Sequence, residues 1–235
     1  GHVHAQRNLG YVYKNGEGVS VDFPTAFYWF SRAAEQEDVK AIYEIGWMYY
    51  SGKGLDSDYH KAYEYFLRAS KQEFNSAYYA LGVMHWNGYG VEKDYAKAVD
   101  WWYRCREYGP AYHNIAIAWR DGKGREKNLD MYRKFILYCQ DKVPYPDGMN
   151  EIAYNFALGR YGWSVQLDKA HEVINDAIEL EPNDPNYYDS KGEFYSLQGK
   201  YVEAKEMWLK VKSIDPSYYK ENNTELHKYI LKHNK

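Results

Sequence analysis

The feature that most constrains the fold of this chain is a segment that recurs at nearly constant spacing. The segments 5–19, 41–55 and 77–91 align with starts 36 residues apart, and a fourth copy, 111–125, starts 34 residues later. Each copy has apolar residues at helical spacing, then a Gly-x-Gly turn, then a second apolar stripe. A period of this length is typical of stacked helical hairpins. We therefore expect an all-α fold, a right-handed superhelix of helix-turn-helix repeats.

The second helix of each predicted hairpin carries one small-large-small stripe in six successive copies. The stripe consists of Ala26, Phe30 and Ala33; Ala62, Phe66 and Ala69; Ala98, Trp102 and Cys105; Tyr132, Ile136 and Cys139; Ala170, Ile174 and Ala177; and Ala204, Trp208 and Val211. Residues four and three positions apart lie on one face of a helix. This face is predicted to pack into the core of its hairpin.

Two further columns recur in the predicted first helices. A small residue occupies Gly10, Gly46, Gly82, Ala116, Ala153 and Gly192. We expect the two helices of a hairpin to approach closely there, because a larger side chain would hold their backbones apart. A large planar residue follows three positions later, at Tyr13, Tyr49, His85, Trp119, Phe156 and Tyr195. We expect this second column in the core, with His85 as a core histidine.

The turns between the predicted helices have their own chemistry. Paired glycines supply the positive φ values that end one helix and redirect the chain, at 16 and 18, 52 and 54, 88 and 90, and 122 and 124. Asp22, Asp58 and Asp94 follow at 36-residue spacing, just before each second helix. A carboxylate at that position is predicted to cap the free amides of the helix.

The repeat pattern A-x-x-x-L-G-x-x-Y-x-x-G-x-G-V, followed by D-x-x-x-A-x-x-W-x-x-x-A-A, resembles the Sel1-like repeat family over residues 4–142. The segment 181–216 resembles a tetratricopeptide repeat. We expect one continuous solenoid with four parts: four Sel1-like repeats over 4–142, a degenerate fifth over 143–183, a tetratricopeptide-like repeat over 184–217 and a C-terminal capping helix over 218–235. The proline-containing connector 142–148 is predicted to introduce a bend.

Charge and motif content weigh against several function classes. The net charge of −3, with no basic arm, disfavours a dedicated nucleic-acid binder. The longest apolar runs are shorter than the ~20 residues of a membrane helix, so no membrane insertion is expected. No HExxH, G-x-S-x-G, Walker loop or paired-cysteine motif is present. We therefore expect no enzyme activity, no cofactor and no metal site.

The two cysteines take small core positions of successive repeats. Cys105 and Cys139 stand where the other copies have Ala or Val, and we expect both to remain free thiols. Cysteine-rich Sel1-like proteins instead carry a disulfide pair in each repeat. This departure weighs against transferring their discussed ligand-binding activity to this chain.

The resemblance to both repeat families implies a non-enzymatic scaffold that binds an extended peptide or a partner helix on its concave face. Two alternatives remain open. One is a ligand-binding or hydrolytic protein acting on a cell-wall-type small molecule, and the other is a regulatory module of a longer polypeptide. The sequence leaves the oligomeric state undetermined, and both a cytoplasmic and an exported location remain open. Because a repeat helix begins almost at once, we expect the natural protein to continue upstream.

Residues of the binding face follow from the groove positions that tetratricopeptide-like repeats use. Counted from the small residue of each first helix, these positions hold Arg7, Tyr11, Lys14, Lys40, Tyr43, Trp47, Tyr50, Ser76, Tyr79, Val83, Trp86, His113, Ile117, Arg120, Asn150 and Tyr154. Aromatic residues dominate the middle of this set, with basic residues beside them. Tyr, Trp and Arg are the residue types that most often carry interface energy. We expect a partly acidic or aromatic peptide, with Trp47, Tyr79 and Trp86 as anchors.

Overall fold

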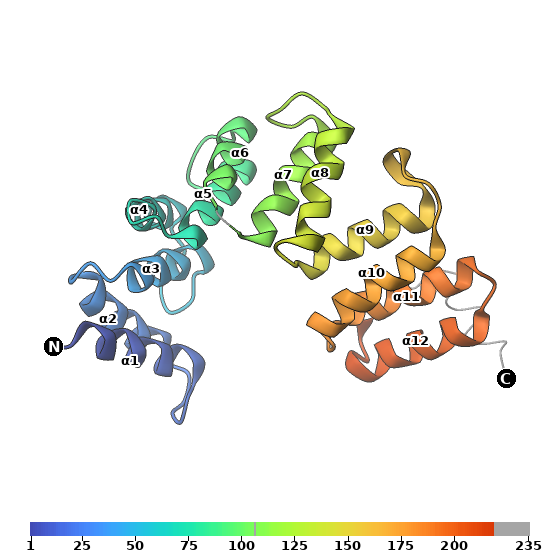
Figure 1. Cartoon of the computed structure of the whole chain (residues 1–235). Coiled ribbons are helices and arrows are strands. Elements are labelled where there is room, and N and C mark those ends of the chain that lie inside the picture. The colour runs from blue at the N-terminus through green and yellow to red at the C-terminus, as the bar shows by residue number, and fades with distance from the viewer. Residues whose placement is uncertain (106, 219–235) are drawn as a thin grey trace. The chain divides into compact units, whose positions relative to one another are not determined.

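The computed structural model describes residues 1–105 and 107–218, and this part of the chain is all-α, built from antiparallel helical hairpins (Figure 1). The helices are α1 (Val3–Asn15), α2 (Phe23–Ala34), α3 (Val39–Ser51), α4 (Tyr59–Ser70), α5 (Asn75–Asn87), α6 (Tyr95–Arg104), α7 (Gly109–Asp121), α8 (Leu129–Asp141), α9 (Pro146–Leu158), α10 (Leu167–Leu180), α11 (Pro185–Leu197) and α12 (Tyr201–Ile214), with a short 3₁₀ turn η1 at Arg160–Gly162. The predicted fold class, a solenoid of helical repeats, is confirmed.

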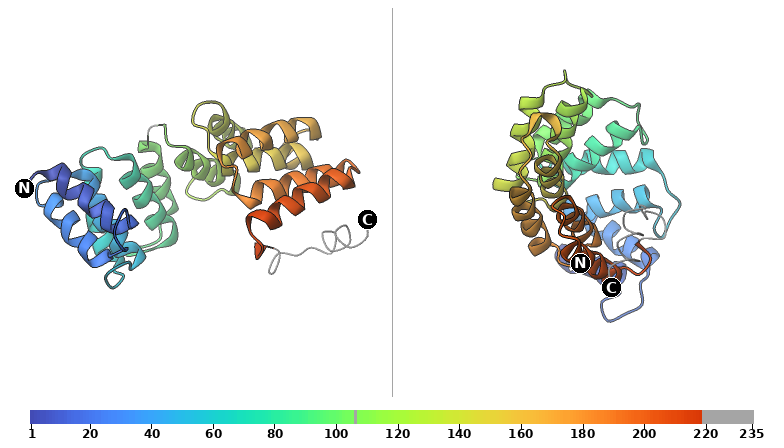
Figure 2. Two further views of the ribbon diagram at one scale, coloured as in Figure 1. Left: turned by 90° about the horizontal axis from the view of Figure 1, so that it is seen from below. Right: turned by 90° about the vertical axis from the view of Figure 1, so that its right-hand side faces the viewer.

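The chain divides into two compact units, residues 1–132 and a second unit that begins at Arg133, within α8. In the first unit α1 to α6 pack in chain order, each helix against the next (Figures 1 and 2). In the second unit α9, α10, α11 and α12 pack in the same way. The predicted capping helix over 218–235 lies outside the described residues except for Tyr218, whose hydroxyl donates a hydrogen bond to Asn186 Oδ1 (2.8 Å).

The second-helix stripe is buried in all six copies, as predicted, and none of its members is more than 2% exposed. The small column of the first helices packs against the large member of this stripe. A Cβ added at Gly46 would lie 2.8 Å from Cδ1 of Phe66, and one at Gly10 would lie 2.5 Å from Phe30. The close approach is therefore between an aromatic ring and a helix backbone, rather than between two backbones.

The prediction for the planar column is only partly right. His85 is buried, but Tyr13, Tyr49, Trp119, Phe156 and Tyr195 are only half-buried. The fully buried residues, such as Met48 and Met84, lie two positions after the small residue instead of three. Successive residues of a helix are rotated by about 100° around its axis. A residue three positions after the small one therefore lies at the edge of the core, where its side chain stays partly exposed.

The predicted turn chemistry is confirmed. All eight glycines of the four Gly-x-Gly turns have positive φ. Asp22, Asp58 and Asp94 cap α2, α4 and α6 by accepting hydrogen bonds from the amides three residues later. Hydrogen bonds lower the pKa of all three carboxyl groups, chiefly the bond from the Thr25 hydroxyl at Asp22 and the bonds from the backbone amides at Asp58 and Asp94. The amides of the same residues bond to carbonyls of the planar column, as Asp58 does to Tyr49 (2.9 Å), which fixes each second helix against the first.

The two cysteines lie in the core, and in the described part of the chain neither forms a disulfide. Burial raises the pKa of the Cys105 thiol to about 12 and that of the Cys139 thiol to about 12. Both side chains therefore serve as small apolar core residues, and neither has the character of a reactive thiolate.

Candidate functional site: an aromatic groove on α3 and α5

Five of the predicted binding residues line one cavity of about 260 Å³ in the first unit. Tyr43, Trp47 and Tyr50 come from α3, and Tyr79 and Val83 come from α5. Phe66 of α4 and Ala80 of α5 complete the lining. We call the cavity formed by these seven residues the aromatic groove.

Helix geometry places these side chains together. Residues 43, 47 and 50 are spaced by four and three positions, so they form one stripe along α3. The stripe packs against Phe66, with the Tyr43 ring centroid 5.3 Å from that of Phe66. Tyr79 occupies the position in α5 that Tyr43 has in α3, one 36-residue period later. The repeat thus places Tyr79 and Val83 of α5 in the same cavity as the aromatic stripe of α3.

The hydroxyls of Tyr43 and Tyr50 in the groove stay protonated. Burial is the main cause that raises the pKa of both Tyr43 and Tyr50. For Tyr43 the neighbouring Tyr108 adds to the effect. Protonated phenols can donate hydrogen bonds, so the groove offers apolar rings together with polar donors.

Two lysines flank the Trp47 ring. Lys14 Nζ lies 4.7 Å from the ring centroid, and Lys53 Nζ lies 5.0 Å from it. Lys14 is also paired with Glu44, whose Oε2 is 2.6 Å away and which is only 8% exposed. Lys53 is exposed, and within residues 1–105 and 107–218 it forms no ion pair with a carboxylate. The groove therefore has one lysine neutralised by a buried acid and one open to solution.

Most of the predicted basic residues already form ion pairs with acidic residues of the same chain. Arg7 Nη1 lies 2.8 Å from Asp38 Oδ2, and Arg120 Nε lies 2.7 Å from Asp121 Oδ1. Lys40 is exposed. The net positive charge beside the aromatic residues is therefore smaller than the sequence suggests. Asp38, distant in the sequence, neutralises Arg7, and the adjacent Asp121 neutralises Arg120.

The remaining predicted residues lie outside the groove lining. Tyr11 packs edge-on against Phe30, and its pKa is raised by burial and by Glu44. Trp86 packs on Tyr95 and Trp102, with ring centroids 4.7 and 5.2 Å apart, while Ser76, His113 and Ile117 are half-buried. Tyr154 and Asn150 belong to the second unit, where the Tyr154 hydroxyl donates to Glu193 Oε2 (2.7 Å).

Sequence reasoning missed two residues of the groove lining, Phe66 and Ala80, and one residue beside the groove, Lys53. Phe66 belongs to the predicted core stripe, packs in the core as expected, and also lines the groove. Lys53 is the middle residue of the Gly52-Lys53-Gly54 turn. The Gly-x-Gly pattern could have indicated it, because the positive-φ glycines on either side turn the chain at this residue, and its Nζ lies over the Trp47 ring of α3.

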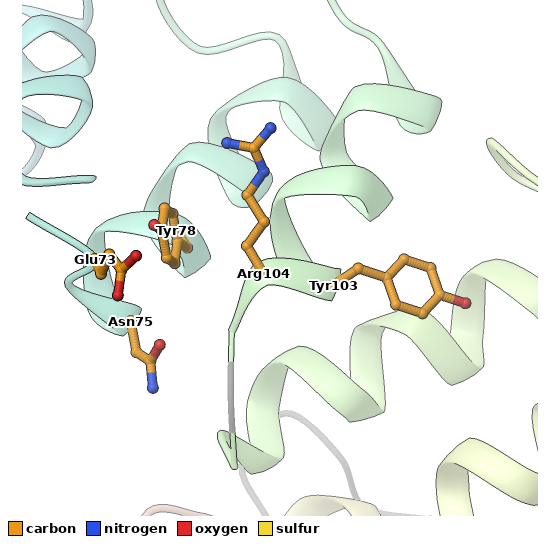
Figure 3. A pocket seen from close by; sticks show the side chains of 5 residues that line it. All are labelled: Glu73, Asn75, Tyr78, Tyr103 and Arg104. Carbon is orange, nitrogen blue, oxygen red and sulfur yellow. The ribbon is translucent and has the colours of Figure 1, made fainter. Parts of the chain in front are cut away.

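A second cavity, of about 440 Å³, lies where α6 ends beside the start of α5 (Figure 3). It is lined by Glu73, Asn75, Tyr78, Tyr103 and Arg104. Figure 3 shows Tyr103 directed away from the other four side chains. Arg104 lies over the Trp101 ring, 4.5 Å from its centroid, and the Tyr103 hydroxyl accepts a hydrogen bond from Trp119 Nε1 (3.0 Å). These contacts give Arg104 and Tyr103 roles in packing.

Among residues 1–105 and 107–218, no three His, Cys, Asp or Glu side chains gather in a way that could hold a metal ion. In the same residues no helix has the length and apolarity needed to cross a bilayer.

The family and structural comparisons agree with this architecture. Residues 3–38, 39–74 and 75–104 match the model of the Sel1 repeat. No curated protein matches the chain.

Two solved structures of Sel1-type proteins are similar. A Sel1 repeat protein from Oxalobacter formigenes is 24% identical, with a TM-score of 0.81 over 91% of this chain and 89% of that one. A protective antigen of uropathogenic Escherichia coli with an SLR fold is 22% identical, with a TM-score of 0.72 over 93% of this chain; the match spans 49% of the antigen.

Yeast Tom70 has a more distant likeness, at 19% identity and a TM-score of 0.56, over 92% of this chain and 45% of that one. At these identities the three structures support the fold of this chain.

Proposed function

Because the chain carries three Sel1 repeats over residues 3–104, we propose that it is a non-enzymatic interaction scaffold that binds an extended peptide along α3 and α5. Helical repeat folds of this kind generally mediate protein–protein interaction. The observation that carries the proposal is the aromatic groove. Tyr43, Trp47, Tyr50, Tyr79 and Val83, selected as binding positions, all line one cavity of about 260 Å³.

The groove supports a particular ligand chemistry. A cavity lined by Trp47, Tyr79 and Phe66 favours an apolar or aromatic side chain of the peptide. The exposed Lys53 beside Trp47 favours a carboxylate next to that side chain. Since Arg7 and Lys14 are already paired with Asp38 and Glu44, we expect the aromatic contact to contribute more than the acidic one.

A displayed library of random peptides tests the proposal on the full chain. We expect peptides with an aromatic or large aliphatic residue to be enriched. Calorimetry then measures the affinity of the enriched peptides for the chain. Trp47→Ala and Tyr79→Ala should each cost about 2 kcal/mol of binding free energy, or roughly 30-fold in Kd. Trp86→Ala extends the test to the third predicted anchor, which lies outside the groove lining.

The matched control is Tyr28→Ala, which removes a tyrosine that is 55% exposed on α2, away from the groove. It should leave the affinity unchanged, and circular dichroism should show that every variant keeps its helical content. Folded Trp47→Ala and Tyr79→Ala variants that bind the selected peptides as tightly as the original chain would reject the groove as the binding site.

A further inference from the structure

A third cavity of the first unit, of about 300 Å³, is lined by residues of α4, α5 and α6, and we call it the α6 cavity. Its lining consists of Tyr63 of α4, His85 of α5, and Lys97, Asp100, Trp101 and Arg104 of α6. The four α6 residues are spaced by three, one and three positions, so they form one face of that helix. None of the six residues lines the aromatic groove. The volume is at the lower end of the range that small-molecule sites span.

Arg104 lacks the partners that its counterpart in the preceding repeat has. Arg68 stands one 36-residue period earlier, and its Nη2 donates a hydrogen bond to the Ala34 carbonyl oxygen (2.6 Å) and lies 2.6 Å from Glu37 Oε1. The residue that corresponds to Glu37 is Glu73. In the described part of the chain Arg104 forms no ion pair, and Figure 3 shows the Glu73 and Arg104 side chains apart.

The one printed contact of Arg104 leaves its donors available. Its Cζ lies 4.5 Å from the centroid of the Trp101 ring. A guanidinium group held over an aromatic ring keeps its N–H donors for other partners. A carboxylate can accept two of these donors in parallel. Arg104 is therefore a positioned cation beside the α6 cavity.

The remaining charges of the lining favour a ligand with a single negative charge. Lys97 Nζ lies 3.3 Å from Asp94 Oδ2, and Asp100 is paired with Arg125. Both pairs are neutral, so Arg104 supplies the net positive charge. Because Asp100 still presents a carboxylate to the cavity, a phosphate dianion is repelled more strongly than a carboxylate monoanion.

His85 gives the cavity a group that responds to an anion. Its Nε2 lies 3.3 Å from the Tyr63 hydroxyl, and no described residue completes a hydrogen bond to its buried Nδ1. Burial is the main cause that lowers the pKa of His85; Lys97 lowers it further, whereas the Glu92 backbone and Asp94 oppose the change. A negative charge nearby favours the protonated ring. An anion in the cavity and a proton on His85 therefore stabilise each other.

We propose that the α6 cavity is a binding site for a carboxylate attached to an aromatic or other planar apolar group. Arg104 binds the carboxylate, and the rings of Trp101 and Tyr63 contact the apolar part. His85 lies beside the bound anion. The site shares no residue with the aromatic groove and does not depend on peptide binding there.

Benzoate is the probe that tests this site on the full chain, and NMR signals of the histidine rings are the readout. We expect a saturable shift of the His85 signals and a rise of the His85 pKa by about one pH unit in saturating benzoate. Affinity should increase as the pH falls from the pKa of the bound state to that of the ligand-free state. His171 lies in the second unit, and burial lowers its pKa too, so it serves as an internal control that should not change.

Variants assign the binding to Arg104. Arg104→Gln should weaken benzoate binding by about tenfold or more, because a charge-assisted contact is lost. The matched control is Arg32→Gln, which changes the corresponding arginine of α2, a half-exposed residue paired with Glu35 (3.5 Å). That variant and Trp47→Ala, which alters the aromatic groove, should keep the original affinity. Circular dichroism should show unchanged helical content in all three.

Three results would overturn the proposal. The first is an unchanged affinity in Arg104→Gln, or an unchanged His85 pKa in saturating benzoate. The second is a loss of binding in Trp47→Ala alone, which would assign benzoate to the aromatic groove. The third is that acetate or inorganic phosphate binds at least as tightly as benzoate, which would contradict the requirement for an apolar group or for a single charge.

Discussion

At the scale of single residues, the size of one side chain is matched to the size of its neighbour across the hairpin. Glycine stands opposite an aromatic ring at Gly46 and Phe66, whereas in the fifth repeat Ala153 occupies the glycine position and Ile174 the aromatic one. A methyl group is thus present only where the opposing side chain is smaller. The identity of each small residue reflects packing rather than helix propensity.

Gly46→Ala is expected to destabilise the protein. Within a helix alanine is favoured over glycine by about 1 kcal/mol, but its Cβ would lie 2.8 Å from Phe66 and 3.1 Å from Cβ of Tyr65. Overpacking of this kind costs about 1–3 kcal/mol, so the free energy of unfolding in urea should fall. In a Phe66→Leu background the same change should cost less, because the ring is gone. A more stable Gly46→Ala protein would contradict the packing account.

His85 should make stability depend on pH. Burial lowers its pKa below the ordinary 6.5, so the unfolded chain takes up a proton at a higher pH than the folded one. The free energy of unfolding should therefore fall as the pH drops below about 6.5, until the folded pKa is reached. Denaturant titrations of a His85→Phe variant should show a weaker pH dependence, while His60→Phe, which removes an exposed histidine of α4, should match the original chain. Equal slopes in all three proteins would refute this role.

At the scale of elements, the two glycines of each turn have different tasks. Both have positive φ. A Cβ at Gly90 would lie 2.5 Å from the Tyr59 carbonyl oxygen of the preceding hairpin, whereas one at Gly88 would be tight only against its own turn, 3.3 Å from Lys93 Cβ. The first glycine ends its helix, and the second sets the spacing between hairpins.

Gly90→Ala should therefore cost more stability than Gly18→Ala, which occupies the same turn position in the first repeat. Both changes place a side chain at positive φ, with φ of 66° and 75°. Only the Gly90 change adds a clash with the backbone of α4. The difference in urea midpoint between the two variants measures the contact between hairpins. Equal losses would show that backbone strain alone explains the glycine.

At the scale of the whole molecule, stability should be distributed locally, because each helix packs mainly against its neighbours in the chain. Phe66→Ala removes a ring that is 2% exposed and should cost about 3–5 kcal/mol. Hydrogen exchange should accelerate in α3 to α6 and stay near its original rate in α10 to α12. Ile174→Ala, at the matching stripe position of the second unit, should give the reverse pattern. Uniform acceleration along the whole chain would instead indicate one cooperative unit.

The sequence by itself determined the features that depend on local spacing. The 36-residue period, the six buried stripes, the positive-φ glycines and the aspartate caps each follow from the geometry of a helix or turn, and the structure confirms them. The positions of Tyr43, Trp47, Tyr50 and Tyr79 on one face also follow from the period. Such features are set by spacing within one helix or turn and by the repetition of that spacing along the chain.

Only the tertiary structure decided what each face of a helix meets. The planar column lies at a half-buried rim, because spacing along one helix does not say which neighbour covers it. Lys14 and Arg7 are paired with Glu44 and Asp38, which lie 30 and 31 residues away in the sequence. Burial and ion pairing depend on contacts between hairpins, and these contacts are fixed only when the hairpins stack.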